Sequence, residues 1–358
     1  MGTELAALKK SADIQRMFKE FGIKPIEEIA DLFPNKTLID IGLLIAHRDF
    51  DHLLRGLAQG KKFAIVSGRG PSGPLHLGHI LLFSLVKHLQ DIFNAEVFIP
   101  ISDDEKFIFG KVPKLEDAEK WAYDNIRYIA ALGFDPNKTH IYISSKTTWV
   151  YRYALKCARK MTISMIKSAL GTTDSHNPGI LFYAAVQIAH ILQPTFDYNL
   201  PVVVPIGLDQ DVFMRLARDV AQLLHVMKPA SLYVQFLPGP RGEPMSSSKP
   251  ETALFVNADS KQAWRIIANL FTGGQGSIRE QFLKGGNPDV CHVFLWLKHL
   301  FFKNKGEIEV YAEMCRSGEL ICGLDCKPLL HELVMDFLAR LRDAAEKVNI
   351  EKFLRDSH

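Results

Sequence analysis

Cysteine is scarce in this chain. There are five cysteines in 358 residues, and they are odd in number and gathered late in the sequence. A disulfide framework is therefore excluded, and a reducing cytosol is the expected compartment. Cys322 and Cys326 lie close together without a second Cys or His pair at zinc-ligand spacing, so ordinary thiols are expected there rather than a metal site.

Long apolar runs and an excess of one charge are also missing. No stretch of about 18 apolar residues occurs, so no membrane span is expected. The polar start, residues 1–14, lacks the apolar core of a secretion signal. With 43 basic and 40 acidic residues, any RNA-binding surface has to be a local patch. A P-loop kinase is excluded because no Gly-x4-Gly-Lys-Ser/Thr motif occurs.

Short apolar runs alternate with helix-like segments in the middle of the chain. Crossovers of this length return each strand parallel to the last, which predicts a Rossmann-like α/β sheet with helices on both faces. The expected strands are 63–66, 97–101, 141–143, 202–206 and 231–236, and the expected helices are 79–93, 115–132 and 210–223.

The two ends of the chain have a different pattern. Residues 49–57 have apolar side chains at helical spacing, and the strongest late helices are 261–271, 290–302 and 329–353. Glycine-rich breaks at 272–274 and 285–287 separate them. We therefore predict three domains: a helical N-terminal extension (1–60), a catalytic nucleotide-binding domain (61–254) and an all-helical C-terminal domain (255–358).

Four polar clusters follow predicted strands, at 67–79, 102–106, 207–211 and 241–249. Ligands of open α/β sheets bind at the carboxyl ends of the strands, so these clusters are candidate site segments. In the first cluster, His76 and His79 share one face of a first helical turn. Gly78 leaves room for a base or phosphate, and the free N–H groups attract an anion. The alternative is two histidines that merely cap a helix.

His76-Leu77-Gly78-His79 resembles the first signature of class I aminoacyl-tRNA synthetases, which binds ATP. The preceding Ser67–Ser72, Ser-Gly-Arg-Gly-Pro-Ser, is similar to the tryptophanyl enzymes of archaea and the eukaryotic cytosol, in which the arginine reaches the ATP phosphates. Residues 244–249, Pro-Met-Ser-Ser-Ser-Lys, resemble the second signature of the class. Pro244 replaces its first lysine, and Lys249, five residues on, is the candidate to substitute for it if the loop folds suitably.

Two further elements extend the resemblance over nearly the whole chain. Gly207-Leu208-Asp209-Gln210 is similar to the element that positions the ATP ribose and the amino acid, although Asp209 by itself reads as an N-cap. The resemblance implies that Glu105 and Lys106 reach the substrate and that Gln187 is a pocket glutamine. It also implies an anticodon-binding role for the C-terminal helices.

The residues expected to line an indole pocket depart from the family. Val66 and Pro100 stand where the family has a tyrosine and a glutamine, and neither side chain offers a hydrogen bond. An indole N–H buried without a partner costs roughly 1–3 kcal/mol. Glu105 therefore either satisfies the indole, or the choice of amino acid has changed.

The resemblance gives a full set of expected site residues, with no protein metal ligand and with Mg²⁺ accompanying ATP. Expected catalytic residues are Arg69, His76, His79, Ser246, Ser248 and Lys249. Expected ATP-binding residues are Gly68, Arg69, Gly70, Ser72, His76, Gly78, His79, Gly207, Asp209, Gln210, Met245 and Ser246. Expected substrate-binding residues are Val66, Pro100, Glu105, Lys106, Gln187 and Gln210.

Three functions stay open from the sequence. The first is a cytoplasmic, homodimeric ligase that activates tryptophan with ATP and charges tRNA. The second is a synthetase-like RNA-binding or regulatory protein with altered or lost amino-acid specificity, which Val66, Pro100 and Pro244 favour. The third is a small-molecule nucleotidyltransferase, against which the helical C-terminal third argues.

Overall fold

The computed structural model describes residue 18 and residues 20–355, so residues 1–17 and 19 of the predicted N-terminal extension lie outside the described residues. The chain divides into two compact units. The first contains Met1–Ala46, Leu75–Leu82 and Gln235–Ala344. The second contains His47–Pro74, Phe83–Val234 and Ala345–His358.

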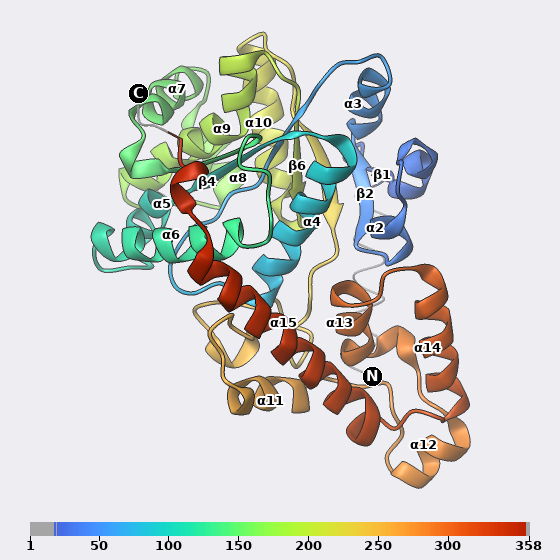
Figure 1. Cartoon of the computed structure of the whole chain (residues 1–358). Helices are drawn as coiled ribbons and strands as arrows, with labels where there is room; N and C mark the ends of the chain where they lie inside the picture. The colour runs from blue at the N-terminus through green and yellow to red at the C-terminus, as the bar shows by residue number, and fades with distance from the viewer. Residues whose placement is uncertain (1–17, 19, 356–358) are drawn as a thin grey trace. The chain divides into compact units, whose positions relative to one another are not determined.

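The second unit is built on five parallel strands in the order β7-β6-β3-β4-β5, of which β4 and β6 are labelled in Figure 1. Their residues are apolar and buried on both faces, as expected for a parallel sheet covered by helices. The predicted Rossmann-like sheet is thereby confirmed, and each of the five strands lies where its apolar run predicts it. The strands are β3 (Ala64–Val66), β4 (Glu96–Ile101), β5 (Thr139–Ile143), β6 (Val202–Ile206) and β7 (Ala230–Val234).

Helices follow these strands in the alternation that the sequence predicts. The expected helices at 115–132 and 210–223 are confirmed within two residues at each end. The helices of this unit are α3 (Phe50–Leu57), α5 (Asp103–Ile108), α6 (Leu115–Ala130), α7 (Thr148–Ala158), α8 (Ile163–Leu170), α9 (Pro178–Tyr198) and α10 (Asp211–Leu223), with short η2 (Ser144–Lys146), η3 (Leu208–Gln210) and η7 (Ile350–Lys352). Helix α4 (Leu77–Phe93) begins in the first unit.

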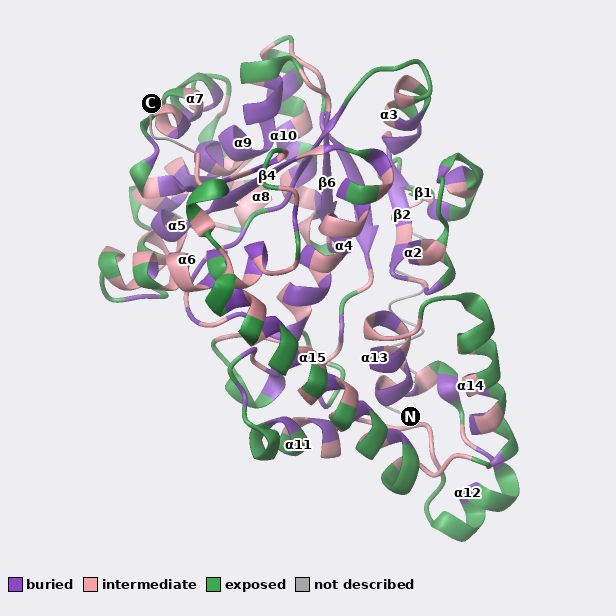
Figure 2. Ribbon diagram, viewed as in Figure 1, coloured by how far each residue is buried: buried purple, intermediate pink, exposed green. Residues whose placement is uncertain are grey.

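Helix α9 is the central helix of the second unit's core. It is capped by Asn177, whose side chain accepts a hydrogen bond from Ile180 N at 3.2 Å. By length and composition α9 is apolar enough to cross a membrane, but 72% of its most apolar stretch is buried inside the protein (Figure 2). It packs with Val66, Phe98 and Tyr142 in one apolar cluster, so its hydrophobicity is explained by the core.

The first unit is mostly helical, as predicted for the C-terminal part of the chain. Trp296 is fully buried in this unit and donates from Nε1 to Pro238 O at 2.9 Å. Its elements are β1 (Lys24–Pro25), η1 (Ile26–Leu32), α2 (Thr37–Asp40), β2 (Leu44–Arg48), whose last two residues belong to the second unit, η4 (Pro250–Thr252), α11 (Ser260–Ala268), α12 (Ile278–Lys284), η5 (Pro288–Val290), α13 (His292–Leu300), α14 (Lys305–Ser317), the π-helical η6 (Cys322–Cys326) and α15 (Lys327–Lys347). All five cysteines of the chain are free.

Two stretches differ from the sequence prediction. The N-terminal part was expected to be helical, but Leu44–Arg48 forms strand β2, because a short apolar run suits a buried strand as well as a helix. The last helix ends at Lys347 instead of continuing to Phe353. There the chain turns and pairs with β5: Ile141 N donates to Phe353 O and Arg355 N donates to Ile141 O, both at 2.8 Å.

Candidate functional site

The histidine turn, residues 76–79, forms the start of α4 in the first unit. The imidazole rings of His76 and His79 stack with centroids 3.6 Å apart, and the backbone N–H of His76 donates to Nδ1 of His79 at 3.2 Å. Leu77 N donates to Leu254 O at 2.9 Å, so a segment far along the chain fixes this turn. The two histidines thus share one face, as their spacing predicts.

Gly78 brings the histidine turn close to the second predicted signature. A Cβ atom at this glycine would lie 3.1 Å from the His76 ring and 3.7 Å from Sδ of Met245. The segment around Met245 therefore runs directly beside the turn, within the same unit. A side chain at position 78 would fill the space in which a flat group can lie against the backbone.

The serine loop, residues 244–249, is closed by its own local contacts. Lys249 N donates to Ser246 O at 3.1 Å, and the hydroxyls of Ser246 and Ser248 lie 2.9 Å apart. Thr252 anchors the loop: its buried hydroxyl accepts from Ser246 N at 3.1 Å and donates to Lys249 O at 2.7 Å. Ser248 and Lys249 are exposed, so their polar groups are available to a ligand.

The arginine loop, residues 67–73, leaves β3 in the second unit and continues along β4. Arg69 N donates to Pro100 O at 2.9 Å, and Ser102 N donates to Arg69 O at 2.8 Å. At Gly70 a Cβ atom would lie 2.3 Å from a carboxylate oxygen of Glu105 and 2.0 Å from Cε of Lys106. A side chain at this position would displace both of these flexible side chains, so the glycine lets the two predicted substrate residues lie against the loop.

Arg69 is buried, with 9% of its surface exposed. Its Nε donates to Oδ1 of Asn125 at 3.0 Å, whereas no described residue accepts a hydrogen bond from its Nη2. Burial lowers the pKa of Arg69 to about 10, opposed by the negative charge of Glu105, so the guanidinium stays charged at neutral pH. A buried cationic donor without a partner is costly, and an anionic oxygen is the ligand that would satisfy it.

Asn125 is a site residue that the sequence analysis missed. It is fully buried on α6, and besides holding Arg69 it donates from Nδ2 to Gly73 O at 3.0 Å. One amide thus holds both the Arg69 side chain and the end of the arginine loop at Gly73. A polar residue within an amphipathic helix gives no local sign of such a role, although an asparagine on the apolar face of 115–132 is a signal that periodicity offers.

The aspartates of the 102–106 cluster have a supporting role. Asp104 accepts hydrogen bonds from Ser144 Oγ at 2.7 Å and from the Tyr151 hydroxyl at 3.0 Å. Asp103 is held by Ser145. Burial raises the pKa of both carboxyl groups. They fix the start of α5, from which half-buried Glu105 and Lys106 project, joined to each other at 2.8 Å.

The Gly207–Asp211 segment leaves β6, the neighbour of β3, at the same edge of the sheet as the arginine loop. Asp209 is exposed and accepts from Gln210 Nε2 at 2.7 Å. The N-cap reading of Asp209 is wrong, because Gln210 occupies the cap position of α10 and no side chain caps that helix. Asp211 is instead buried and pairs with Arg48 at 2.6 Å.

The predicted indole-pocket residues lie in apolar surroundings. Val66 is 2% exposed in the core cluster with Tyr142, and Pro100 lies opposite Tyr142 in the β4–β5 register. Gln187 is half-buried on α9. Buried polar groups of the same unit include the Tyr142 hydroxyl and His190, 3.1 Å apart. Burial lowers the pKa of His190 to about 3, so its imidazole is neutral at pH 7.

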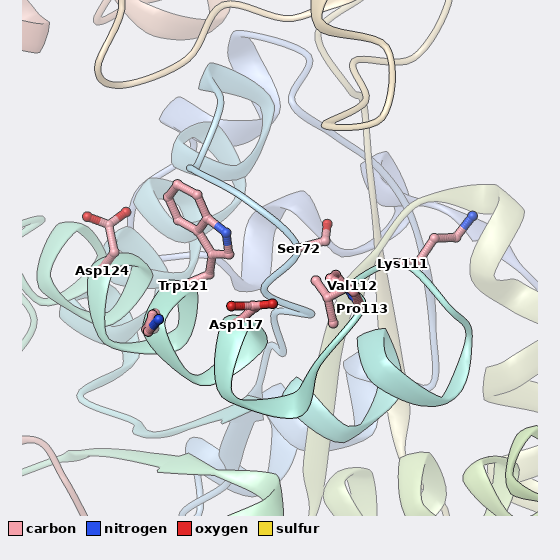
Figure 3. Close-up of a pocket in the computed structure, with 8 residues that line it drawn as sticks. Ser72, Lys111, Val112, Pro113, Asp117, Trp121 and Asp124 are labelled. Carbon is pink, nitrogen blue, oxygen red and sulfur yellow. The ribbon is translucent and has the colours of Figure 1, made fainter.

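The structure thus gathers the predicted residues in two sets. His76, Gly78, His79, Met245, Ser246 and Ser248 lie together in the first unit, and Gly68, Arg69, Gly70, Glu105 and Lys106 lie together in the second. Ser72 lines a pocket together with residues of α6 and of the segment before it (Figure 3).

Comparison with known proteins gives a consistent set of similarities. Residues 58–339 match the family described as tRNA synthetases class I (W and Y). The chain is 40% identical to a tryptophan–tRNA ligase of Pyrobaculum calidifontis, over 94% of this chain and 92% of the relative. Among solved structures, tryptophanyl-tRNA synthetase of Aeropyrum pernix superposes with a TM-score of 0.86 at 30% identity, covering 96% of each chain. That of Encephalitozoon cuniculi, bound to tryptophan, gives 0.85 at 30% identity, over 96% of this chain and 98% of that one.

Proposed function

The chain belongs to the tRNA synthetases class I (W and Y) family, and from this premise we propose that it activates tryptophan with ATP and transfers the aminoacyl group to tRNA. One observation carries the nucleotide part: the guanidinium of Arg69 is buried and charged, and one of its nitrogens has no hydrogen-bond partner among the described residues. A phosphate oxygen is the group that satisfies such a donor.

In the first half-reaction, the tryptophan carboxylate attacks the α-phosphorus of ATP, a P–O bond forms, and pyrophosphate leaves. No protein nucleophile is needed, because positioning and preorganised charge supply the rate. Arg69 binds a phosphate oxygen, while His76 and His79 offer imidazole N–H groups to the triphosphate. Lys249 supplies the cation that Pro244 does not, and balances the charge that develops on pyrophosphate.

In the second half-reaction, a ribose hydroxyl of the tRNA 3′ end attacks the carbonyl carbon of the adenylate, and AMP leaves with the bonding electron pair. Mg²⁺ enters with the triphosphate, whose oxygens are ligands it prefers. Among the described residues, no group of three His, Cys, Asp or Glu side chains is placed to hold a metal ion. We further propose a homodimer with two-fold symmetry acting in a reducing compartment.

The test is ATP–pyrophosphate exchange with each of the twenty amino acids, followed by charging of a tRNA transcript. Tryptophan is expected to drive exchange, and the same preparation is expected to charge tRNA. If folded protein shows no pyrophosphate exchange with any of the twenty amino acids, the proposal is contradicted. Charging without preference for tryptophan would contradict only the substrate.

A tryptophan analogue sharpens the test of the amino-acid pocket. Val66 and Pro100 offer the indole N–H no acceptor, so recognition rests on apolar fit unless Glu105 supplies one. The benzothiophene analogue has the same shape and no N–H. We expect discrimination against it of about 10² or less, whereas a pocket with a dedicated acceptor gives about 10⁴–10⁵. Glu105→Gln measured with both substrates shows whether that carboxylate contributes.

A further inference from the structure

A pocket of about 500 Å³ lies in the second unit, on the α6 side of the arginine loop. Of the predicted ATP and amino-acid residues, only Ser72 lines it, so it is a separate site. Its volume suits a ligand of nucleotide size. The other lining residues come from α6 and the segment before it: Lys111, Val112, Pro113, Asp117, Lys120, Trp121 and Asp124.

Carboxylates and lysines both line the pocket (Figure 3). Asp117, Trp121 and Asp124 follow one another at helical spacing on one face of α6, and Lys120 of the same helix also lines the pocket. Lys111 lies at the opposite end from Asp124. An indole face flanked by carboxylates suits a base that carries an amino group, and an exposed lysine suits a phosphate.

Burial supports this assignment at Asp124. It raises the pKa of Asp124, because burial penalises its charged form more than Arg127 and Asn125 compensate. A carboxylate in that state gains from an added N–H donor. The pocket's charged side chains are two lysines and two aspartates, so a free nucleoside triphosphate has no excess of cations to meet it. A single phosphodiester beside Lys111 matches the charge better.

The pocket also shares its wall with the arginine loop. Ser72 lies between Arg69 and Gly73, both of which are bonded to Asn125 of the same helix α6. A ligand in the pocket therefore contacts the element that positions Arg69. Because of this continuity, a nucleotide within a polynucleotide that extends to the reacting groups is a better candidate than a free nucleotide.

We infer that this pocket binds a cytidine of the tRNA acceptor end, with the base stacked on Trp121, its amino group donating to Asp124 or Asp117, and its phosphate beside Lys111. The inference rests on the proposed function and extends it, since every tRNA ends in C-C-A. Binding of a cytidine here places the nucleotides before the terminal adenosine in the second unit and thereby positions the terminal ribose for acylation.

The first experiment compares Trp121→Ala with the unmodified protein in two assays. Loss of one base–aromatic stack is expected to lower kcat/KM for tRNA roughly 10- to 100-fold. Tryptophan-dependent pyrophosphate exchange should change little. Trp121→Phe, which keeps a stacking face, should recover most charging. Tyr198→Ala, an exposed aromatic residue elsewhere in the same unit, is the matched control and should charge normally.

The second experiment exchanges the chemistry of the base. A transcript in which one terminal cytidine is replaced by uridine lacks the amino group and should be charged poorly. Asp124→Asn, whose amide donates to the uracil O4, should recover that transcript and disfavour the normal one. Because Asp117 is the other candidate acceptor, Asp117→Asn is measured in parallel.

Several outcomes overturn the inference. Normal charging by Trp121→Ala would do so, as would an equal loss in both assays that Trp121→Phe does not repair. Strong inhibition of charging by free CMP, abolished in Trp121→Ala, would assign the pocket to a free nucleotide instead. A protein that exchanges pyrophosphate but charges no tRNA at all would contradict the proposed function itself.

Discussion

The serine loop and the arginine loop are built in different ways. The serine loop is closed by contacts among residues 246–252, and its hydroxyls and Lys249 face solvent. The arginine loop is fixed by β4, α5 and α6, and its cation is buried. The difference indicates a preorganised phosphate site in one unit and, in the other, a segment that rearranges at low cost.

The largest effect is expected from removing the buried cation of the arginine loop. Arg69→Ala should lower kcat/KM for ATP in pyrophosphate exchange by about 10²–10³, the cost of removing one preorganised donor. Arg69→Lys should remain well below the unmodified protein, since an ammonium cannot both reach Asn125 and offer a second nitrogen. Arg340→Ala, at an exposed arginine on α15, is the control. An unchanged ATP dependence in Arg69→Ala would remove Arg69 from the site.

Asn125 tests whether the arginine needs its support. Asn125→Ala leaves Arg69 Nε and Gly73 O without a partner, so unfolding by urea should become easier by about 2 kcal/mol. We expect kcat/KM for ATP to fall roughly tenfold, because the guanidinium of Arg69 is misplaced once Asn125 no longer holds it. Asn125→Asp should recover part of the stability by pairing with Arg69, yet bind ATP worse because the charge is neutralised. Equal recovery of both quantities would mean that Asn125 is only structural.

Substitution in the exposed serine loop should change kcat and leave stability nearly unchanged. Lys249→Ala should lower kcat of exchange about tenfold with a small change in KM, since the charge it meets develops only in the transition state. The unfolding free energy should change by less than about 0.5 kcal/mol, as for other exposed substitutions. Pro244→Lys in this background should restore the rate. A rise in KM without loss of kcat would show ground-state binding instead.

A pH effect is expected from His190, which is buried and contacts Tyr142 and Ser144 in the same unit as the arginine loop. Burial lowers the pKa of His190 to about 3, whereas in the unfolded chain it is about 6.5. Between these values the unfolded chain binds more protons, so stability present above pH 6.5 is lost as the pH falls, by up to about 1.4 kcal/mol per pH unit. His190→Gln should flatten this slope in urea unfolding at pH 7, 6 and 5. The exposed His52→Gln should leave it unchanged.

The sequence predicted best what depends on local pattern. The runs at 97–101 and 202–206 are apolar and β-branched, and both are strands within one residue of the prediction. The histidine turn follows from spacing alone. What escaped prediction depends on distant partners: Asn125 holds Arg69 from 56 positions away, and Thr252 closes the serine loop. A one-dimensional pattern contains no sign of which buried polar groups face each other.

The same limit applies to the aspartates at 103 and 104. Adjacent charges are typical of a solvated loop, yet both are buried because the turn after β5 supplies hydroxyl partners. The sequence pattern does not determine the substrate specificity either. Val66 and Pro100 are buried on strands, as their apolar runs predict. Which atoms would contact an indole, however, depends on the packing of α9.

The pairing of Phe353–Arg355 with β5 bears on how the protein is made. Ile141 leaves the ribosome roughly two hundred residues before the segment around Leu354 that pairs with it. Until then, the outer strand of the sheet presents unpaired amides to other chains. Synthesis of this protein therefore includes an interval in which nascent chains can associate edge to edge, and slow translation of the last helix lengthens it.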